Sequence, residues 1–125
     1  VLPKGIFRAA RILFVAGFLC LPAAAQREYP ISAVQGNRNI SPLENQTVRV
    51  SGIVTARMRN GFFLQTPDGQ ADNDPATSEG IHVFTRAEPP ADAVPGHAVT
   101  VSGRVMEFRP GNQAASLTIT QITFT

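Results

Sequence analysis

Apolar and polar residues alternate with a period of two along much of the chain after residue 46. In the segment 47–57 every second residue is small or apolar, and the residues between them are mostly polar. This period is typical of a β-strand with one buried face. No segment after residue 26 keeps the 3.6-residue period of an amphipathic helix, so the pattern predicts an all-β domain. The expected core positions of the first strand are Val48, Val50, Gly52, Val54 and Ala56.

Four more strands follow from the same alternation and from the turn signals between them. Asn60-Gly61 favours a tight hairpin turn after the first strand. A long loop rich in Asp and Gly, a segment with three prolines and a short polar turn separate the later strands. The predicted strands are 47–57, 62–66, 81–86, 98–108 and 116–125, and the fourth directs Val99, Val101, Gly103 and Val105 toward the core.

The first and fourth predicted strands share the pattern Val-x-Val-Ser-Gly-x-Val, at 48–54 and 99–105. A glycine inside a strand is typical of a bulge or of a bend at a barrel corner. Five strands, two of them long and bent, predict the five-stranded Greek-key barrel called the OB-fold. The alternative, a β-sandwich, commonly needs about seven strands. The proline-rich segment 87–96 would replace the helix that usually joins the third and fourth strands of an OB-fold.

The first 25 residues differ from the rest and predict a cleaved export signal. Three basic residues precede an unbroken run of apolar residues and glycine at 12–21, and Ala23-Ala24-Ala25 supplies the small residues that a signal peptidase needs. Ten residues are too short to span a bilayer core of about 30 Å. We therefore expect a signal peptide at 1–25, an OB-fold domain at 26–125, and a secreted or periplasmic protein that is not membrane-bound after cleavage.

Removal of this leader changes the charge of the protein. Residues 26–125 keep eight arginines and nine acidic residues, so their formal net charge is −1. This balance excludes a strongly basic tail for nucleic acid and a polybasic membrane patch. The only cysteine, Cys20, also lies in the leader, so the domain can form neither an internal disulfide nor a thiolate metal site.

Seven short motifs occur in an order that resembles one known family. They are ISAVQG at 31–36, SPL at 41–43, QTV at 46–48, GIVT at 52–55, GFFLQ at 61–65, DPATSEGI at 74–81 and PG at 95–96. In this order they resemble the OB-fold module of large secreted bacterial nucleases, where the module precedes an endonuclease/exonuclease/phosphatase domain. The resemblance implies an exported accessory module that contacts nucleic acid and is separated here from its catalytic domain.

The chain offers few residues for catalysis. His82 and His97 are the only histidines, and the motifs GxSxG, HExxH and the P-loop do not occur. We assign no nucleophile and no general base to this chain. The resemblance implies that full-length members of the family are nucleases, so catalysis would belong to the other domain.

An outer sheet face is the expected binding site, because OB-folds bind oligonucleotides or oligosaccharides on strands two and three. If Ile81 and Val83 point inward, the residues between and after them point outward. Alternation alone does not decide which face of 62–66 is buried, and we expect Phe63 and Gln65 to face outward. Two arginines near the Asn60-Gly61 turn would lie at the rim. The predicted nucleic-acid-binding residues are Arg57, Arg59, Phe63, Gln65, His82, Phe84 and Arg86.

The chemistry of these residues suits single-stranded DNA or RNA. Exposed aromatic rings stack on any base, and arginine contacts phosphate and also stacks. The net charge of −1 predicts weak binding, because counterion release dominates non-specific affinity. The alternative is that Phe63 and Phe84 belong to the core and that the arginines are only solvated.

The acidic loop presents a second candidate site. Asp68, Asp72, Asn73, Asp74 and Glu79 carry oxygen ligands of the kind that calcium prefers. We single out Asp72, Asp74 and Glu79 as the candidate calcium ligands, although their spacing departs from that of an EF-hand. Asx-turns explain the same residues without an ion, so both interpretations stay open.

Two functions are compatible with the sequence. The first is the nucleic-acid-binding module of a secreted nuclease. The second is a free-standing periplasmic OB-fold protein that binds a cation, a sugar or a protein partner. The same length and leader would suit either one.

The export signal makes a direct prediction. We expect the mature protein to begin at Gln26, because Ala23 and Ala25 occupy the −3 and −1 positions of the cleavage site. Amino-terminal sequencing of the protein recovered from the periplasm or the medium tests this. A soluble cytoplasmic protein that keeps its original amino terminus would contradict it.

Overall fold

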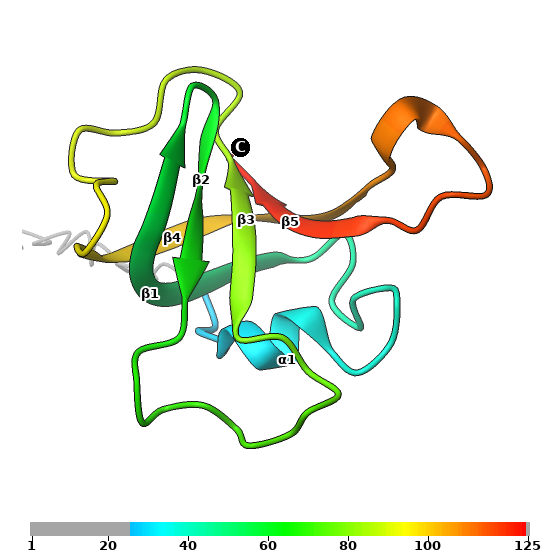
Figure 1. Ribbon diagram of the computed structural model, residues 1–125, viewed down its shortest axis with the longest axis horizontal. Coiled ribbons are helices and arrows are strands. Elements are labelled where there is room, and N and C mark those ends of the chain that lie inside the picture. The colour runs from blue at the N-terminus through cyan, green and yellow to red at the C-terminus, as the bar shows by residue number, and fades with distance from the viewer. Residues whose placement is uncertain (1–25, 125) are drawn as a thin grey trace, which may run out of the picture.

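The computed structural model describes residues 26–124, so the predicted leader lies outside the described residues (Figure 1). Among the residues described, no helix has the length and apolar character needed to cross a membrane. The elements are α1 (Ile31–Gln35), β1 (Thr47–Met58), β2 (Gly61–Gln65), β3 (Gly80–Phe84), β4 (Ala98–Phe108), the 3-10 helix η1 (Pro110–Asn112) and β5 (Ile119–Thr123).

The five strands form a closed barrel in the order β1-β2-β3-β5-β4, with β4 pairing back to β1. All neighbours are antiparallel except β3 and β5, which are parallel. This confirms the predicted all-β, five-stranded Greek-key barrel of the OB-fold type. Residues 26–124 contain the whole barrel and its core, so this part of the chain can fold as an independent unit.

The predicted strands agree with the observed ones to within three residues at each end, and β4 has the predicted bounds. The third strand ends earlier than expected, at Phe84 rather than at Arg86. Arg86 has a φ of 67°, in the left-handed region, which an extended strand does not adopt. Arg86 therefore lies beyond the end of β3 and is not part of the sheet.

One short helix was not predicted by periodicity. α1 has only five residues, fewer than two turns, so no repeat is visible in its sequence. Ile31 and Val34, one turn apart, are both buried in the barrel core. α1 lies against the end of the barrel where β2 finishes and β3 begins (Figure 1). In the segment 85–97 the structure has no helix, and this connection contributes Ala93 to the core.

A β-bulge in β1 corrects one prediction. Val54 lies opposite Leu64, and Ala56, not Thr55, lies opposite Phe63. The extra residue reverses which side chains point inward, because successive residues of a strand point to opposite faces. The prediction that Ala56 continues the core face is therefore wrong, and Ala56 is exposed. After the bulge, Met58 is on the outer face and Arg57 lies opposite the buried Phe62.

The two glycines of the shared motif lie where strands pass very close to each other. A Cβ on Gly103 would be 2.5 Å from the Thr123 carbonyl oxygen and 2.6 Å from Ile122 Cγ2. A Cβ on Gly52 would be 2.9 Å from the Gln65 carbonyl oxygen. Both positions are buried. The absence of a side chain therefore lets β4 approach β5, and β1 approach β2.

This packing predicts a large effect for Gly103→Ala. We expect the variant to lower the free energy of unfolding by about 1–3 kcal/mol, because the new methyl group must displace β5 backbone. Gly80→Ala is the matched control, since the nearest atom to its Cβ would be at an ordinary 3.6 Å. Urea unfolding of residues 26–125 measures both variants. Equal urea midpoints for the two variants would contradict the expected clash between a methyl group at position 103 and the β5 backbone.

Candidate nucleic-acid interface

The outer face of β2 and β3 carries a row of three rings. Phe62 and Leu64 are buried in β2, so Phe63 points outward and is 39% exposed. Ile81 and Val83 are buried in β3, so His82 and Phe84 point outward and are partly exposed. The orientation predicted for both strands is confirmed. The rings belong to residues two apart or directly paired, which is why they lie side by side.

The three rings are close enough to act as one platform. Phe63 and His82 are paired across β2 and β3, and their ring centroids are 5.0 Å apart. The centroids of His82 and Phe84 are 6.4 Å apart. Both pairs are tilted by about 40°. Flat aromatic ligands stack on such exposed rings.

A mostly apolar groove of about 320 Å³ runs beside this row. Its other wall comes from β4 and β5, where Phe108 and Ile119 form a cross-strand pair and are 50% and 46% exposed. Met58 completes the groove at the end of β1. The sequence analysis did not identify these three residues. Their place depends on the parallel pairing of β3 with β5 and on the bulge in β1, which local alternation does not reveal.

A buried amide fixes the middle ring of the row. Gln121 is only 7% exposed, and its Oε1 lies 3.2 Å from His82 Nδ1. The Gln121 amide also donates to Thr123 Oγ1 at 3.3 Å. We assign the His82 proton to Nδ1, since Oε1 can only accept. His82 Nε2 is covered and has no hydrogen-bond partner among the described residues.

Gly61 provides the space that the His82 ring occupies. A Cβ on Gly61 would be 2.8 Å from His82 Nε2 and 2.5 Å from the Val83 carbonyl oxygen. The glycine of the Asn60-Gly61 turn therefore has a packing role in addition to its role in the turn. Together, Gly61 and Gln121 hold the imidazole in one orientation.

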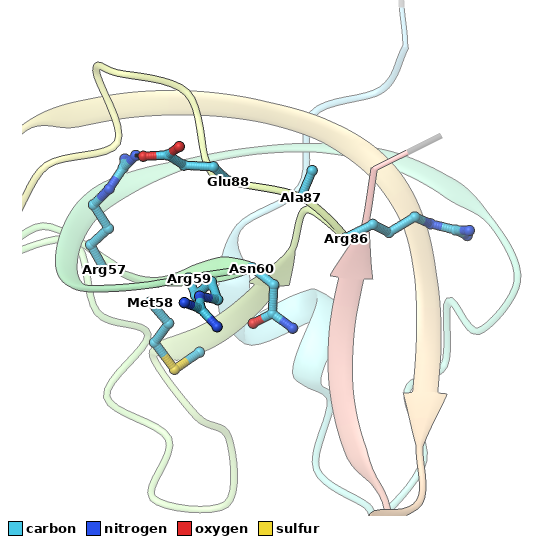
Figure 2. Close-up of a pocket in the computed structure, with 7 residues that line it drawn as sticks. All are labelled: Arg57, Met58, Arg59, Asn60, Arg86, Ala87 and Glu88. Atoms are coloured by element: carbon cyan, nitrogen blue, oxygen red, sulfur yellow. Dashed lines mark ion pairs between the residues drawn. The ribbon is translucent and has the colours of Figure 1, made fainter.

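Arg57 has a structural role, holding the 88–93 loop, that the sequence did not indicate. Its guanidinium donates to the carbonyl oxygens of Pro89 at 2.7 Å, Pro90 at 2.6 Å and Ala93 at 3.0 Å. It also forms an ion pair with Glu88 at 3.7 Å (Figure 2). Because the bulge places Arg57 opposite Phe62, its donors face the 88–93 loop and not the ring row.

Arg59 and Arg86 are the exposed arginines at the hairpin end of the site. Both line an open hollow of about 770 Å³, in which Arg86 extends away from Arg57 (Figure 2). Within residues 26–124 neither of them forms an ion pair. Met58 and Asn60 line both this hollow and the apolar groove, so the two are continuous. Of the other predicted residues, Gln65 is exposed but lines a separate small hollow beside Thr66.

The acidic loop is folded by its own carboxylates. Asp72 Oδ1 accepts a hydrogen bond from the Asp74 amide at 2.9 Å, and Asp72 Oδ2 accepts one from Thr77 Oγ1 at 2.6 Å. Asp74 Oδ1 accepts from the Ala76 amide, and Glu79 Oε1 from the Asp72 amide. The bonds that Asp72 and Asp74 accept from the amides two residues later follow the Asx-turn pattern. No cluster of three or more potential metal ligands is found in the part of the chain that the structure describes, and the calcium site stays a prediction.

Hydrogen bonding also shifts the titration of this loop. The hydroxyl of Thr77, followed by the backbone amide of Asp74, lowers the pKa of Asp72 below its ordinary value. Both donors stabilise the ionised carboxylate. Asp72 therefore favours the folded loop above the pKa of the unfolded chain, and this contribution is lost as the pH falls through the folded pKa.

The sequence comparisons do not assign the chain to a family. No protein-family model and no curated protein matches the chain. The resemblance to the OB-fold module of secreted nucleases therefore stays a prediction.

The loop geometry predicts a specific titration change. Thr77→Val should raise the pKa of Asp72 toward its ordinary value, because it removes the hydroxyl that donates a hydrogen bond to Asp72 Oδ2. Carboxyl chemical shifts followed by NMR against pH measure this. Ser78→Ala is the control, since within residues 26–124 the Ser78 hydroxyl bonds only to Gly80. An unchanged Asp72 titration in Thr77→Val would contradict the assigned cause.

Proposed function

We propose that the outer face of β2 and β3 binds single-stranded DNA or RNA without sequence preference. The row formed by Phe63, His82 and Phe84 is the observation that carries the proposal. Every base has a flat face, and stacking on an aromatic side chain contributes about 1–3 kcal/mol per base. Phe63 is 39% exposed, and His82 and Phe84 are partly exposed, so a base could reach the row.

The arginines at the hairpin end supply the phosphate contacts. Arg59 and Arg86 are exposed, whereas Arg57 is already engaged by the 88–93 loop. Two phosphate contacts on a single strand give a slope of about −1.4 for log K against log salt. With a net charge near zero for the domain, we expect a dissociation constant on the order of 10⁻⁵ M at low salt.

The leader and the family resemblance extend this proposal to the biological setting. The domain would be exported and would serve as the accessory module of a secreted nuclease. It would bind nucleic acid without cleaving it, because its sequence offers no set of residues for metal-assisted phosphodiester chemistry. A protein partner is the second candidate, favoured by the apolar wall that Phe108 and Ile119 add to the groove.

Anisotropy of a fluorescein-labelled 15-mer tests the proposal with residues 26–125. We expect Phe63→Ala to weaken binding about 5- to 150-fold, the equivalent of one lost base stack. The salt slope should stay unchanged, since stacking releases no counterions. The 15-mer should remain intact on a denaturing gel.

Leu117→Ala is the matched control for Phe63→Ala. Leu117 is an exposed apolar residue, at 70%, and lines none of the hollows at this face. Absence of binding at low salt, or equal losses in the two variants, would contradict the proposal. The apolar groove would then favour the protein partner.

A further inference from the structure

A third hollow continues the site at the end opposite the hairpin. It has a volume of about 500 Å³, and it shares Phe63, His82 and Ile119 with the apolar groove. Its remaining lining is mostly polar and includes Arg38 and Gln35. Three connected hollows therefore cross the sheet from Arg59 and Arg86, over the ring row, to Arg38.

The segment that carries Arg38 is fixed at both ends. Before it, the side-chain Nε2 of Gln35 donates to the Gly80 carbonyl oxygen at 2.7 Å, where β3 begins. After it, the Ser41 amide donates to Glu107 Oε1 at 2.8 Å, and the same oxygen accepts from Thr120 Oγ1 at 2.7 Å. These bonds hold the segment against β3, β4 and β5. Arg38 is exposed and forms no ion pair within the described residues.

Charge is distributed unevenly between the path formed by these three hollows and the rest of the domain. Four of the eight arginines of residues 26–125 line the three hollows, but only one of the nine acidic residues does. That acid, Glu88, is paired with Arg57. The path is therefore positive although the domain as a whole carries a net charge of −1, and a polyanion fits it best.

We infer that Arg38 is a third phosphate-contacting residue, so that the site holds a single strand across all three hollows. This inference rests on the proposed function. β2 has five residues and spans about 13 Å. At a stacked rise of about 3.4 Å per nucleotide, this length corresponds to about four nucleotides. The strand would contact Arg59 and Arg86 near one end, stack on the rings in the middle and contact Arg38 at the other end.

The test measures binding of fluorescein-labelled oligothymidylates of 2, 4, 6 and 15 nucleotides at several salt concentrations. For the unchanged protein we expect affinity to rise up to about four nucleotides and then to level off. Arg38→Ala should bind the 15-mer about two- to fivefold more weakly. It should also have a salt slope shallower by about 0.7, the value for one phosphate contact on a single strand. Arg38→Lys should keep the slope, because it keeps the charge.

Arg104→Ala is the matched control, because Arg104 is exposed on β4 and lines none of the three hollows. If Phe63→Ala weakens binding but Arg38→Ala matches Arg104→Ala in affinity and slope, the inference is overturned and the proposed function stands. If the unchanged protein does not bind the 15-mer, the proposed function itself fails, and the inference fails with it.

Discussion

The extra residue in β1 determines which side chains of this strand face the apolar groove and which face the 88–93 loop. β1 pairs with β4 over 47–53 and with β2 over 53–58, and the bulge at Thr55 follows directly after the strand changes partner. Bulges increase the bend and twist of a strand, which a barrel strand needs in order to serve two neighbours. The bulge also reverses the faces beyond it. Met58 therefore reaches the apolar groove, while Arg57 turns to the 88–93 loop and holds it with three hydrogen bonds.

Closure of the barrel forms the second wall of the apolar groove. The parallel pairing of His82 with Gln121 places β5 beside β3 and brings the amide of Gln121 under the ring row. The same closure brings Phe108 and Ile119 across from the rings. It requires a close approach of β4 and β5, which Gly103 permits. The groove is thus a consequence of closing the sheet, and its aromatic platform is built before any ligand arrives. A rigid platform reduces the conformational entropy lost on binding.

Local sequence patterns predicted the strands and the outward direction of the rings, because a period of two depends only on one face being buried. They did not predict α1, which is too short to display a period, or the exposure of Ala56, because a bulge leaves no mark in the alternation. They also missed Phe108 as part of the groove. Its role depends on which strands are neighbours in the closed barrel, and this information lies in contacts between distant segments rather than in any one of them.

Weak binding is compatible with the proposed role as an accessory module. A domain whose positive path is confined to one face, within a net charge of −1, gains little from long-range attraction, so most of its affinity would come from stacking. A module linked to a second domain does not need high affinity, since a short flexible linker gives an effective concentration in the millimolar range. At that concentration a dissociation constant on the order of 10⁻⁵ M keeps the strand bound most of the time. Stacking on the rings makes no base-specific contact, so binding would not depend on the sequence of the strand.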